Sequence, residues 1–140
     1  MNTTNPMNEK TGLLLFAHGA RDPAWARPFE AVLAQIASQR PELVMRLAFL
    51  EFMSPGLEEA ARELVSAGCR RIDVMPLFLG ASGHVRRDVP PLVEALRQQH
   101  GPAVRWQLHT AIGEHPAVIQ AMAGATLDWL NTAAPTVKPS

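Results

Sequence analysis

Short continuous apolar runs alternate along the chain with longer segments in which apolar residues recur at helical spacing. The runs cover residues 13–17, 44–50, 72–79 and 104–108. Unbroken apolar runs of this length are typical of strands that are buried on both faces of a parallel sheet. The segments between them have the length and spacing of crossover helices. The pattern therefore predicts an α/β fold in which helices flank a four-stranded parallel sheet.

Polar residues next to proline or glycine mark the expected ends of the first two helices. Asp22-Pro23 and Ser54-Pro55 each place a capping side chain before a proline, which is typical of a helix start. Gly68 is expected just beyond the end of the second helix, where glycine accepts a left-handed backbone.

Prolines also constrain the last two helices. Because proline inside a helix removes a hydrogen bond and clashes with the preceding turn, Pro90 and Pro91 predict that the third helix begins near Asp88. The fourth helix is expected to begin at Pro116 and to cover the sheet with its apolar residues, which are Val118, Ile119, Met122, Leu127 and Leu130.

The two ends of the chain lack this pattern. Residues 1–10 are polar and are expected to form a flexible N-terminal arm, and residues 131–140 are expected to form a flexible C-terminal tail. The 140 residues, 47% of them hydrophobic, then make one soluble domain over 11–130. No apolar stretch approaches the roughly 18 residues of a membrane span, so no membrane association is expected.

Charge and cysteine content narrow the classes of function. Lys and Arg number 13 and Asp and Glu number 13, so the net charge of zero argues against a general nucleic-acid binder. Cys69 is the single cysteine, which excludes an intrachain disulfide and any metal site built from several thiolates. The expected location is the reducing cytoplasm.

Ionisable side chains follow the ends of the predicted strands. His18 follows the first run, Glu51 the second and His84 the third, at equal intervals of 33 residues. Because the carboxyl ends of parallel strands meet at one edge, we expect these three side chains to converge there. Two imidazoles and a carboxylate suit a borderline divalent metal with positions left open for a substrate, and they also suit proton transfer.

Further candidates lie at the same edge. His109 ends the fourth run, where it either lines a cavity or caps the following loop. Arg21, Arg86 and Arg87 could bind carboxylates through paired N–H groups. Gly83 lets the backbone approach a ligand closely.

Two known phosphate-handling motifs are absent. In the phosphoglycerate-mutase class an arginine precedes the histidine of the His-Gly pair, whereas here Ala17 precedes His18. The glycine-bearing loop at 80–84 lacks the lysine and the spacing of a phosphate-binding loop.

Three segments resemble a known family. LFAHGARDP at 15–23, LAFLE at 47–51 and PLFLGASGHVRRDVP at 76–90 are similar to the short sirohydrochlorin chelatases of the CbiX type, in the same order over about residues 11–130. The resemblance implies a single chelatase-like, flavodoxin-like domain. It also implies ATP-independent insertion of Co²⁺, Fe²⁺ or Ni²⁺ into sirohydrochlorin, in cobalamin or siroheme biosynthesis, with the metal as co-substrate and no permanently bound cofactor.

The resemblance assigns roles to the residues at the edge. It implies that His18 and His84 handle the metal with Glu51 beside them as ligand or base. The candidate residues for binding the acidic ring are Arg21, Gly83, Arg86, Arg87 and His109. A short chain would be half of the bilobal enzyme, so a homodimer is expected. A non-catalytic metal or tetrapyrrole carrier and a plain interaction domain remain the alternatives.

Overall fold

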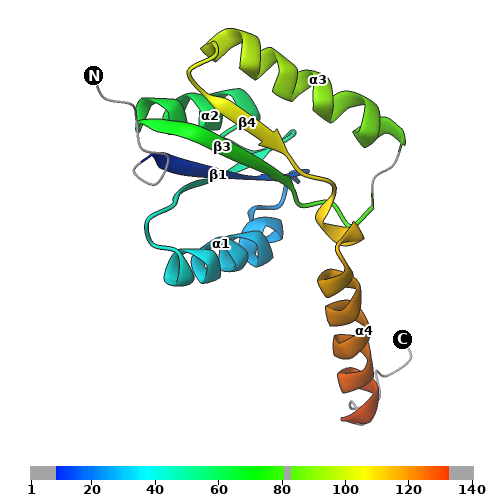
Figure 1. The fold of residues 1–140 in the computed structure, drawn as a ribbon. Coiled ribbons are helices and arrows are strands. Elements are labelled where there is room, and N and C mark those ends of the chain that lie inside the picture. Colours follow the sequence, from blue (N-terminus) through cyan, green and yellow to red (C-terminus); the bar gives the residue numbers. More distant parts are fainter. Residues whose placement is uncertain (1–8, 81–82, 133–140) are drawn as a thin grey trace.

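A computed structural model shows a sheet with helices packed on both of its faces (Figure 1). It describes residues 9–80 and 83–132, and of residues 83–85 it describes only the backbone. The strands are β1 (Lys10–Ala17), β2 (Val44–Phe49), β3 (Cys69–Pro76) and β4 (Arg105–Leu108). The helices are α1 (Arg27–Gln39), α2 (Leu57–Ser66), α3 (Gly83–His100) and α4 (Pro116–Asn131), with short 3-10 helices η2 (Pro23–Ala26) and η3 (Ile112–Glu114).

The four strands are parallel and lie in the order β2-β1-β3-β4. Leu14 of β1 pairs with Arg46 of β2 on one side and with Val74 of β3 on the other. The predicted four-stranded parallel sheet is therefore confirmed. All four strands end at one edge of the sheet, which we call the carboxyl edge.

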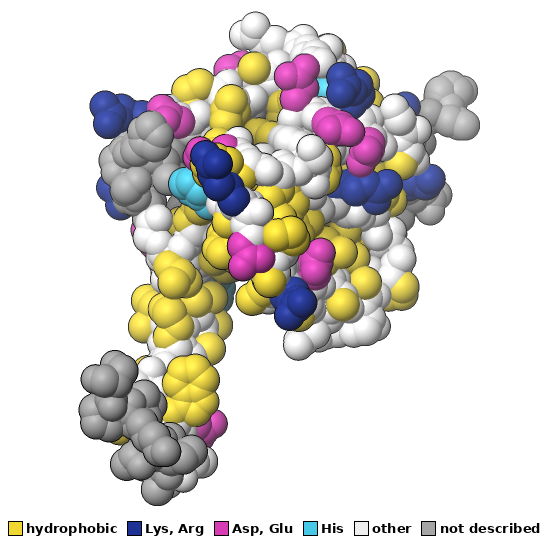
Figure 2. All heavy atoms as spheres, turned by 180° about the vertical axis from the view of Figure 1, so that it is seen from behind, with side chains coloured by type: hydrophobic (Ala, Val, Ile, Leu, Met, Phe, Trp, Pro, Cys, Tyr) yellow, Lys and Arg dark blue, Asp and Glu magenta, His cyan; other side chains and the backbone are white. Residues whose placement is uncertain are grey.

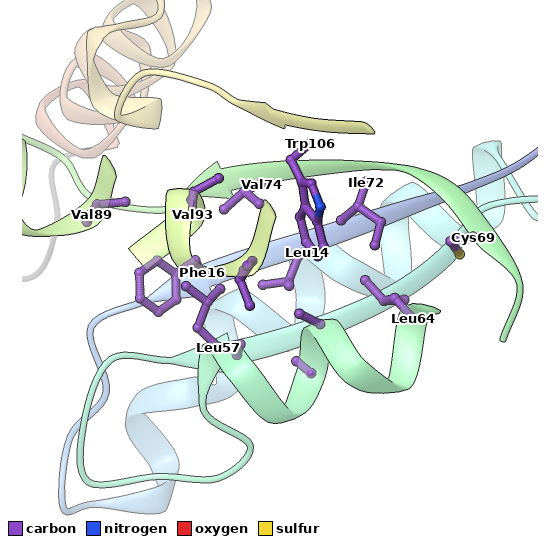
Figure 3. Packing of buried hydrophobic residues seen from close by; sticks show 14 of the residues in the cluster. Leu14, Phe16, Leu57, Leu64, Cys69, Ile72, Val74, Val89, Val93 and Trp106 are labelled. Carbon is purple, nitrogen blue, oxygen red and sulfur yellow. The ribbon is translucent and has the colours of Figure 1, made fainter. Parts of the chain in front are cut away.

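The main core lies between the sheet and helices α2 and α3 (Figure 3). Leu14 and Phe16 of β1 are fully buried there against Leu64 of α2 and Val93 of α3. Trp106 of β4 belongs to the same cluster. This core holds the sheet rigid behind the carboxyl edge.

The opposite face of the sheet carries a smaller cluster. Ala17, Ala26 and Phe49 are buried there, and the rings of Trp25 and Phe29 pack on them with centroids 4.7 Å apart. Helix α1 lies over β2 on this face (Figure 1). No residue of α1 is fully buried, so the helix covers the sheet without being enclosed by it.

Helix α3 begins earlier than the prolines predicted. It starts at Gly83 rather than near Asp88, and it continues through Pro90 and Pro91. Both prolines face solvent, so water can hydrogen-bond the backbone carbonyls that proline leaves unpaired one turn earlier. The buried side chain of Val89 and the core contacts further along the helix hold it in place.

Helix α2 begins later than predicted. The backbone N–H of Phe49 donates to the carbonyl of Pro55 (2.9 Å), and Phe49 forms an isolated parallel bridge with Gly56. This pairing holds Gly56 in an extended conformation, so the helix starts at Leu57 with Gly56 as its N-cap. Gly68 follows the end of α2 with φ of +99°, as predicted.

The Asp22-Pro23 pair starts a helix as predicted, but the helix is η2. The Asp22 carboxylate accepts a hydrogen bond from the backbone N–H of Ala24 (2.9 Å). Helix α1 follows directly at Arg27.

Helix α4 does not cover the sheet. It leaves the carboxyl edge and projects away from the rest of the fold (Figure 1). None of its residues is buried, and Trp129 and Leu130 are 75% and 71% exposed. The prediction that its apolar residues pack on the sheet is wrong for a single copy of the chain, because η3 sends the helix outward before it can fold back.

The expected N-terminal arm and C-terminal tail lie almost wholly outside the described residues. Among the described helices, none is long and apolar enough to cross a membrane.

Candidate functional site

His18 and Glu51 form a pair at the carboxyl edge. His18 directly follows β1, and Glu51 lies just beyond the end of β2. The imidazole Nε2 is 3.5 Å from the carboxylate Oε2, and the two side chains are 49% and 44% exposed. The predicted convergence of these two residues is therefore seen, with both donor groups open to a ligand.

Backbone contacts between the two loops hold this pair together. The N–H of Leu50 donates to the carbonyl of Ala17 (2.9 Å), and the N–H of Glu51 donates to the carbonyl of His18 (3.0 Å). Gly19 has φ of +97°, and a Cβ there would lie 1.9 Å from the carbonyl oxygen of Glu51. Only glycine allows the two loops to approach this closely.

An aromatic side chain supports the imidazole. The ring of Phe78 lies edge-to-face with that of His18, with centroids 6.3 Å apart, and it also contacts Phe16 of the core. Phe78 is only 7% exposed, so its buried ring forms a fixed apolar surface against the histidine. The core thus restricts the orientation of a side chain whose nitrogen remains accessible.

Arg21 lies beside the same pair. Its guanidinium sits 4.9 Å from the ring centroid of Phe52, the residue after Glu51. Phe52 is 58% exposed and has φ of +70°, a backbone conformation that bulky residues rarely adopt. The stacking places a cation at the edge, as predicted for Arg21.

A second cluster joins residues within β3 to His109, which directly follows β4. His109 Nε2 is 2.9 Å from the Oδ2 of Asp73, and Arg71 donates to both oxygens of that carboxylate (3.0 and 3.3 Å). Burial alone would raise the pKa of Asp73, but the hydrogen bonds from Arg71 and His109 outweigh it and hold this pKa below its ordinary value. An ionised Asp73 favours the tautomer of His109 in which Nε2 carries the proton, which leaves Nδ1 as an acceptor.

A cavity of about 360 Å³ lies between the start of α3 and the segment after β4. Its lining combines an apolar wall with the polar groups of Arg86, His109 and Glu114. The remaining lining residues are Pro76, Val89, Pro90, Leu108, Thr110 and Ala111. Of the two alternatives for His109, the structure therefore supports the one in which it lines a cavity.

Other predicted site residues are only partly described. Gly83 and His84 are the first residues of α3, and the side chain of His84 lies outside the described part of the structure. Arg87 is an exposed residue of the same helix. Among the side chains that the structure does describe, no three His, Cys, Asp or Glu groups gather to hold a metal ion. His18 and Glu51 thus provide two donors.

Sequence reasoning missed Asp73 and Phe78. Asp73 is a charged residue inside an otherwise apolar run, and such a residue needs a partner when it is partly buried. That signal was available in the sequence. Phe78 carried no comparable signal, because a phenylalanine in an apolar run is ordinarily part of the core.

Cys69 takes no part in the site. It is fully buried in the main core, and burial raises the pKa of its thiol above the ordinary value. A protonated, enclosed thiol is a poor metal ligand, which agrees with a site built from imidazole and carboxylate groups.

Comparison with known proteins supports the resemblance. The family model of CbiX matches residues 12–126. The chain is 31% identical to the sirohydrochlorin cobaltochelatase of Methanococcoides burtonii over 88 residues, 63% of this chain and 67% of the relative. It is 38% identical to that of Saccharolobus solfataricus over 82 residues, 59% of this chain and 62% of the relative.

Solved structures share the fold. A CbiX protein of cobalamin biosynthesis from Marinobacter aquaeolei aligns with a TM-score of 0.78 and 28% identity, over 91% of this chain and all of that one. The sirohydrochlorin chelatase SirB of Bacillus subtilis in complex with cobalt aligns with a TM-score of 0.68 and 25% identity, over 85% of this chain. This chain spans only 50% of that SirB chain. Sequence and structure together show that the chain belongs to the CbiX family of chelatases.

Proposed function

We propose that this protein inserts a divalent metal into sirohydrochlorin without ATP. The observation that carries the proposal is the accessible pair of His18 and Glu51 at the carboxyl edge of a CbiX-family fold. Ligands of open α/β sheets bind outside this edge. The names of the relatives supply the reaction class.

The paired donors suit a metal that must be held and then released. A neutral imidazole binds a divalent ion through its lone pair, and a neighbouring carboxylate adds charge. Each side chain is about half exposed, which leaves coordination positions open to the nitrogens of the ring. We propose His84 as the second histidine, brought to the metal from the start of α3.

Metal insertion also requires the ring to lose its pyrrole protons. Glu51 is near enough to His18 for either group to take such a proton while the other retains the metal. His18 or Glu51 would change from metal ligand to proton acceptor as the metal passes from the protein to the ring. No covalent intermediate with the protein is needed.

Cationic and polar groups around the edge would bind the carboxylates of the ring. Arg21 extends over Phe52, and Arg86 and His109 line the cavity. We include Arg87 and the backbone of Gly83 in this binding surface because of their position at the start of α3.

We propose Co²⁺ and Fe²⁺ as the metals, and Ni²⁺ as a third because it shares their ligand preferences. The names of the relatives favour cobalt, and SirB structures hold cobalt or Fe³⁺. Cobalamin biosynthesis fits the first metal and siroheme biosynthesis the second. We place the protein in the cytoplasm, where its single buried cysteine stays reduced.

We further propose that the working enzyme is a homodimer. The chain spans about half of each SirB chain, at 50% and 47%, so one SirB chain has room for two such units. Two copies that face each other at the carboxyl edge would enclose a flat macrocycle that one copy leaves open.

The test is to replace His18 by alanine and to measure metal insertion by the absorbance of sirohydrochlorin under anaerobic conditions. We expect the rate above background to fall at least about a hundredfold, in the range found for removal of a catalytic acid–base group. The folded state should be unaffected, because the side chain is half exposed.

His115→Asn is the matched control. His115 caps α4 by accepting from the backbone N–H of Ala117, a role that asparagine can fill. It should insert metal at the wild-type rate. If folded His18→Ala retained that rate as well, the assignment of His18 would be wrong.

A further inference from the structure

Helix α4 carries an apolar stripe with no partner in its own chain. Figure 2 shows hydrophobic side chains along the helix where it projects from the body. Residues at helical spacing form the stripe, and their exposed fractions run from 42% at Met122 to 75% at Trp129. The stripe consists of Ile119, Met122, Leu127, Trp129 and Leu130. The opposite face carries small or polar residues, among them Ala121, Gly124 and Asp128.

Contacts at the start of α4 fix the outward direction of the helix. Gly113 of η3 lies so close to the segment after β3 that a Cβ there would be 1.8 Å from the carbonyl of Leu79. The N–H of Gly113 also donates to the carbonyl of Phe78 (3.0 Å). His115 then caps the first turn of α4. The outward path of the helix is therefore set by specific contacts.

A second uncovered apolar surface of the chain lies on helix α1. A groove of about 280 Å³ runs along its outer side, with Val32 42% exposed. We call it the α1 groove, and its lining residues are Ala31, Val32, Gln35, Ile36, Gln39 and Arg40. One chain thus carries a projecting apolar stripe on α4 and a groove on α1. The two helices lie on the same side of the sheet (Figure 1).

The composition of α4 favours a protein surface as its partner. The helix contains no Lys or Arg, and Asp128 is its one acidic residue. Helices that lie on anionic membranes carry basic residues on their polar face, and α4 lacks them. Two different surfaces on the same chain can satisfy each other twice when two copies pair about a two-fold axis. The length of SirB, which has room for two such units, favours the pairing of two copies.

We propose that α4 of each copy packs into the α1 groove of a second copy, so that the two helices are exchanged across a two-fold axis. This contact would form the interface of the homodimer in the proposed function. It depends on the proposal that two copies pair, and it does not depend on the proposal that they insert metal. Since α4 leaves from the carboxyl edge, its seat on the partner brings the second copy toward His18 and Glu51.

The test is the oligomeric state of the full chain, measured by sedimentation velocity over a range of concentrations. Wild type should sediment at about twice the mass of the 15.3-kDa chain. Ile119→Glu, in the stripe, and Val32→Glu, in the groove, should each raise the dimer dissociation constant at least tenfold. Both side chains are exposed in one copy, so neither change disturbs its core.

Ala121→Glu is the matched control, because it adds the same charge to the opposite face of α4. It should remain as dimeric as wild type. A monomeric wild type, an Ile119→Glu dimer as tight as wild type, or equal weakening by Ala121→Glu would overturn the proposal. If Val32→Glu dimerised as tightly as wild type, the proposal that α4 binds in the α1 groove would be wrong. A dimer that follows these expectations but inserts no metal would support the interface and contradict the proposed function.

Discussion

Gly19 positions His18 and Glu51, the pair that we propose handles the metal, without contributing a side chain. Its left-handed backbone and its approach to the carbonyl of Glu51 leave no space for a Cβ. We expect Gly19→Ala to lower the free energy of unfolding by about 1–3 kcal/mol, the usual cost of a strained backbone. It should also slow metal insertion, because the loops that carry His18 and Glu51 must separate.

Gly124→Ala is the control for this change. Gly124 lies inside α4, and a Cβ there would meet nothing within 4 Å. Alanine should raise the helical stability by about 0.5–1 kcal/mol. Urea unfolding of both variants provides the measurement, and a Gly19→Ala variant as stable as wild type would show that the close approach is not needed.

Asp73 is expected to stabilise the fold through its charge. Asp73→Asn loses the charge-assisted hydrogen bonds to Arg71 and His109, so the free energy of unfolding at pH 7 should fall by about 1–3 kcal/mol. The pKa of Asp73 lies below its ordinary value in the folded state, so this stabilisation is full above about pH 4. It disappears as the pH falls through the folded-state pKa.

Chemical unfolding of wild type and Asp73→Asn at pH 7 and at pH 3 checks this dependence. The gap between the two proteins should narrow at the lower pH. Glu94→Gln breaks a surface pair with Arg97 and should change stability by less than about 1 kcal/mol. A gap at Asp73 that is constant with pH would show that its charge is not responsible.

Single residues were predictable where fold logic alone places them. His18 and Glu51 follow strands of one parallel sheet, so their meeting at the carboxyl edge could be predicted. The contact of His109 with Asp73 also depends on β3 and β4 being neighbours and on the register that pairs Asp73 with Gln107. That register is a property of the assembled sheet, which the order of residues does not reveal.

At the scale of elements, α3 contains two prolines, and we expect Pro91 to destabilise the helix. Pro91 is exposed and does not line the cavity. Among the residues that it describes, the structure therefore shows no contact of Pro91 that would offset the helical hydrogen bond that proline cannot donate. We expect Pro91→Ala to raise the free energy of unfolding by about 1–3 kcal/mol, since proline is about 3 kcal/mol less favourable than alanine inside a helix. Urea unfolding is the measurement. A destabilised variant would indicate that Pro91 makes a contact in the working assembly.

The elements were easier to predict than their boundaries. Each apolar run proved to be a strand, because burial on both faces leaves a clear pattern. The start of α2 was displaced by the bridge between Phe49 and Gly56, and α3 extended past its prolines because core contacts favour the helix. Tertiary contacts decided both boundaries, and a local pattern does not contain them.

For the whole molecule, the position of α4 was the largest departure from the prediction. Its apolar spacing indicated a helix that covers the sheet, and the helix itself is present. The helical spacing of the apolar residues indicates that the stripe is buried against a partner. It does not indicate whether that partner lies in the same chain. The resemblance implied a second copy, and the exposed stripe is the structural feature that agrees with it.

The central claim is that this chain catalyses metal insertion rather than carrying metal or ring. The most direct measurement follows sirohydrochlorin absorbance anaerobically with Co²⁺ and with Fe²⁺, using far less protein than ring. We predict conversion of many equivalents of ring per chain, faster than the reaction without protein. Conversion at the spontaneous rate, or a change that stops after one equivalent, would contradict the claim.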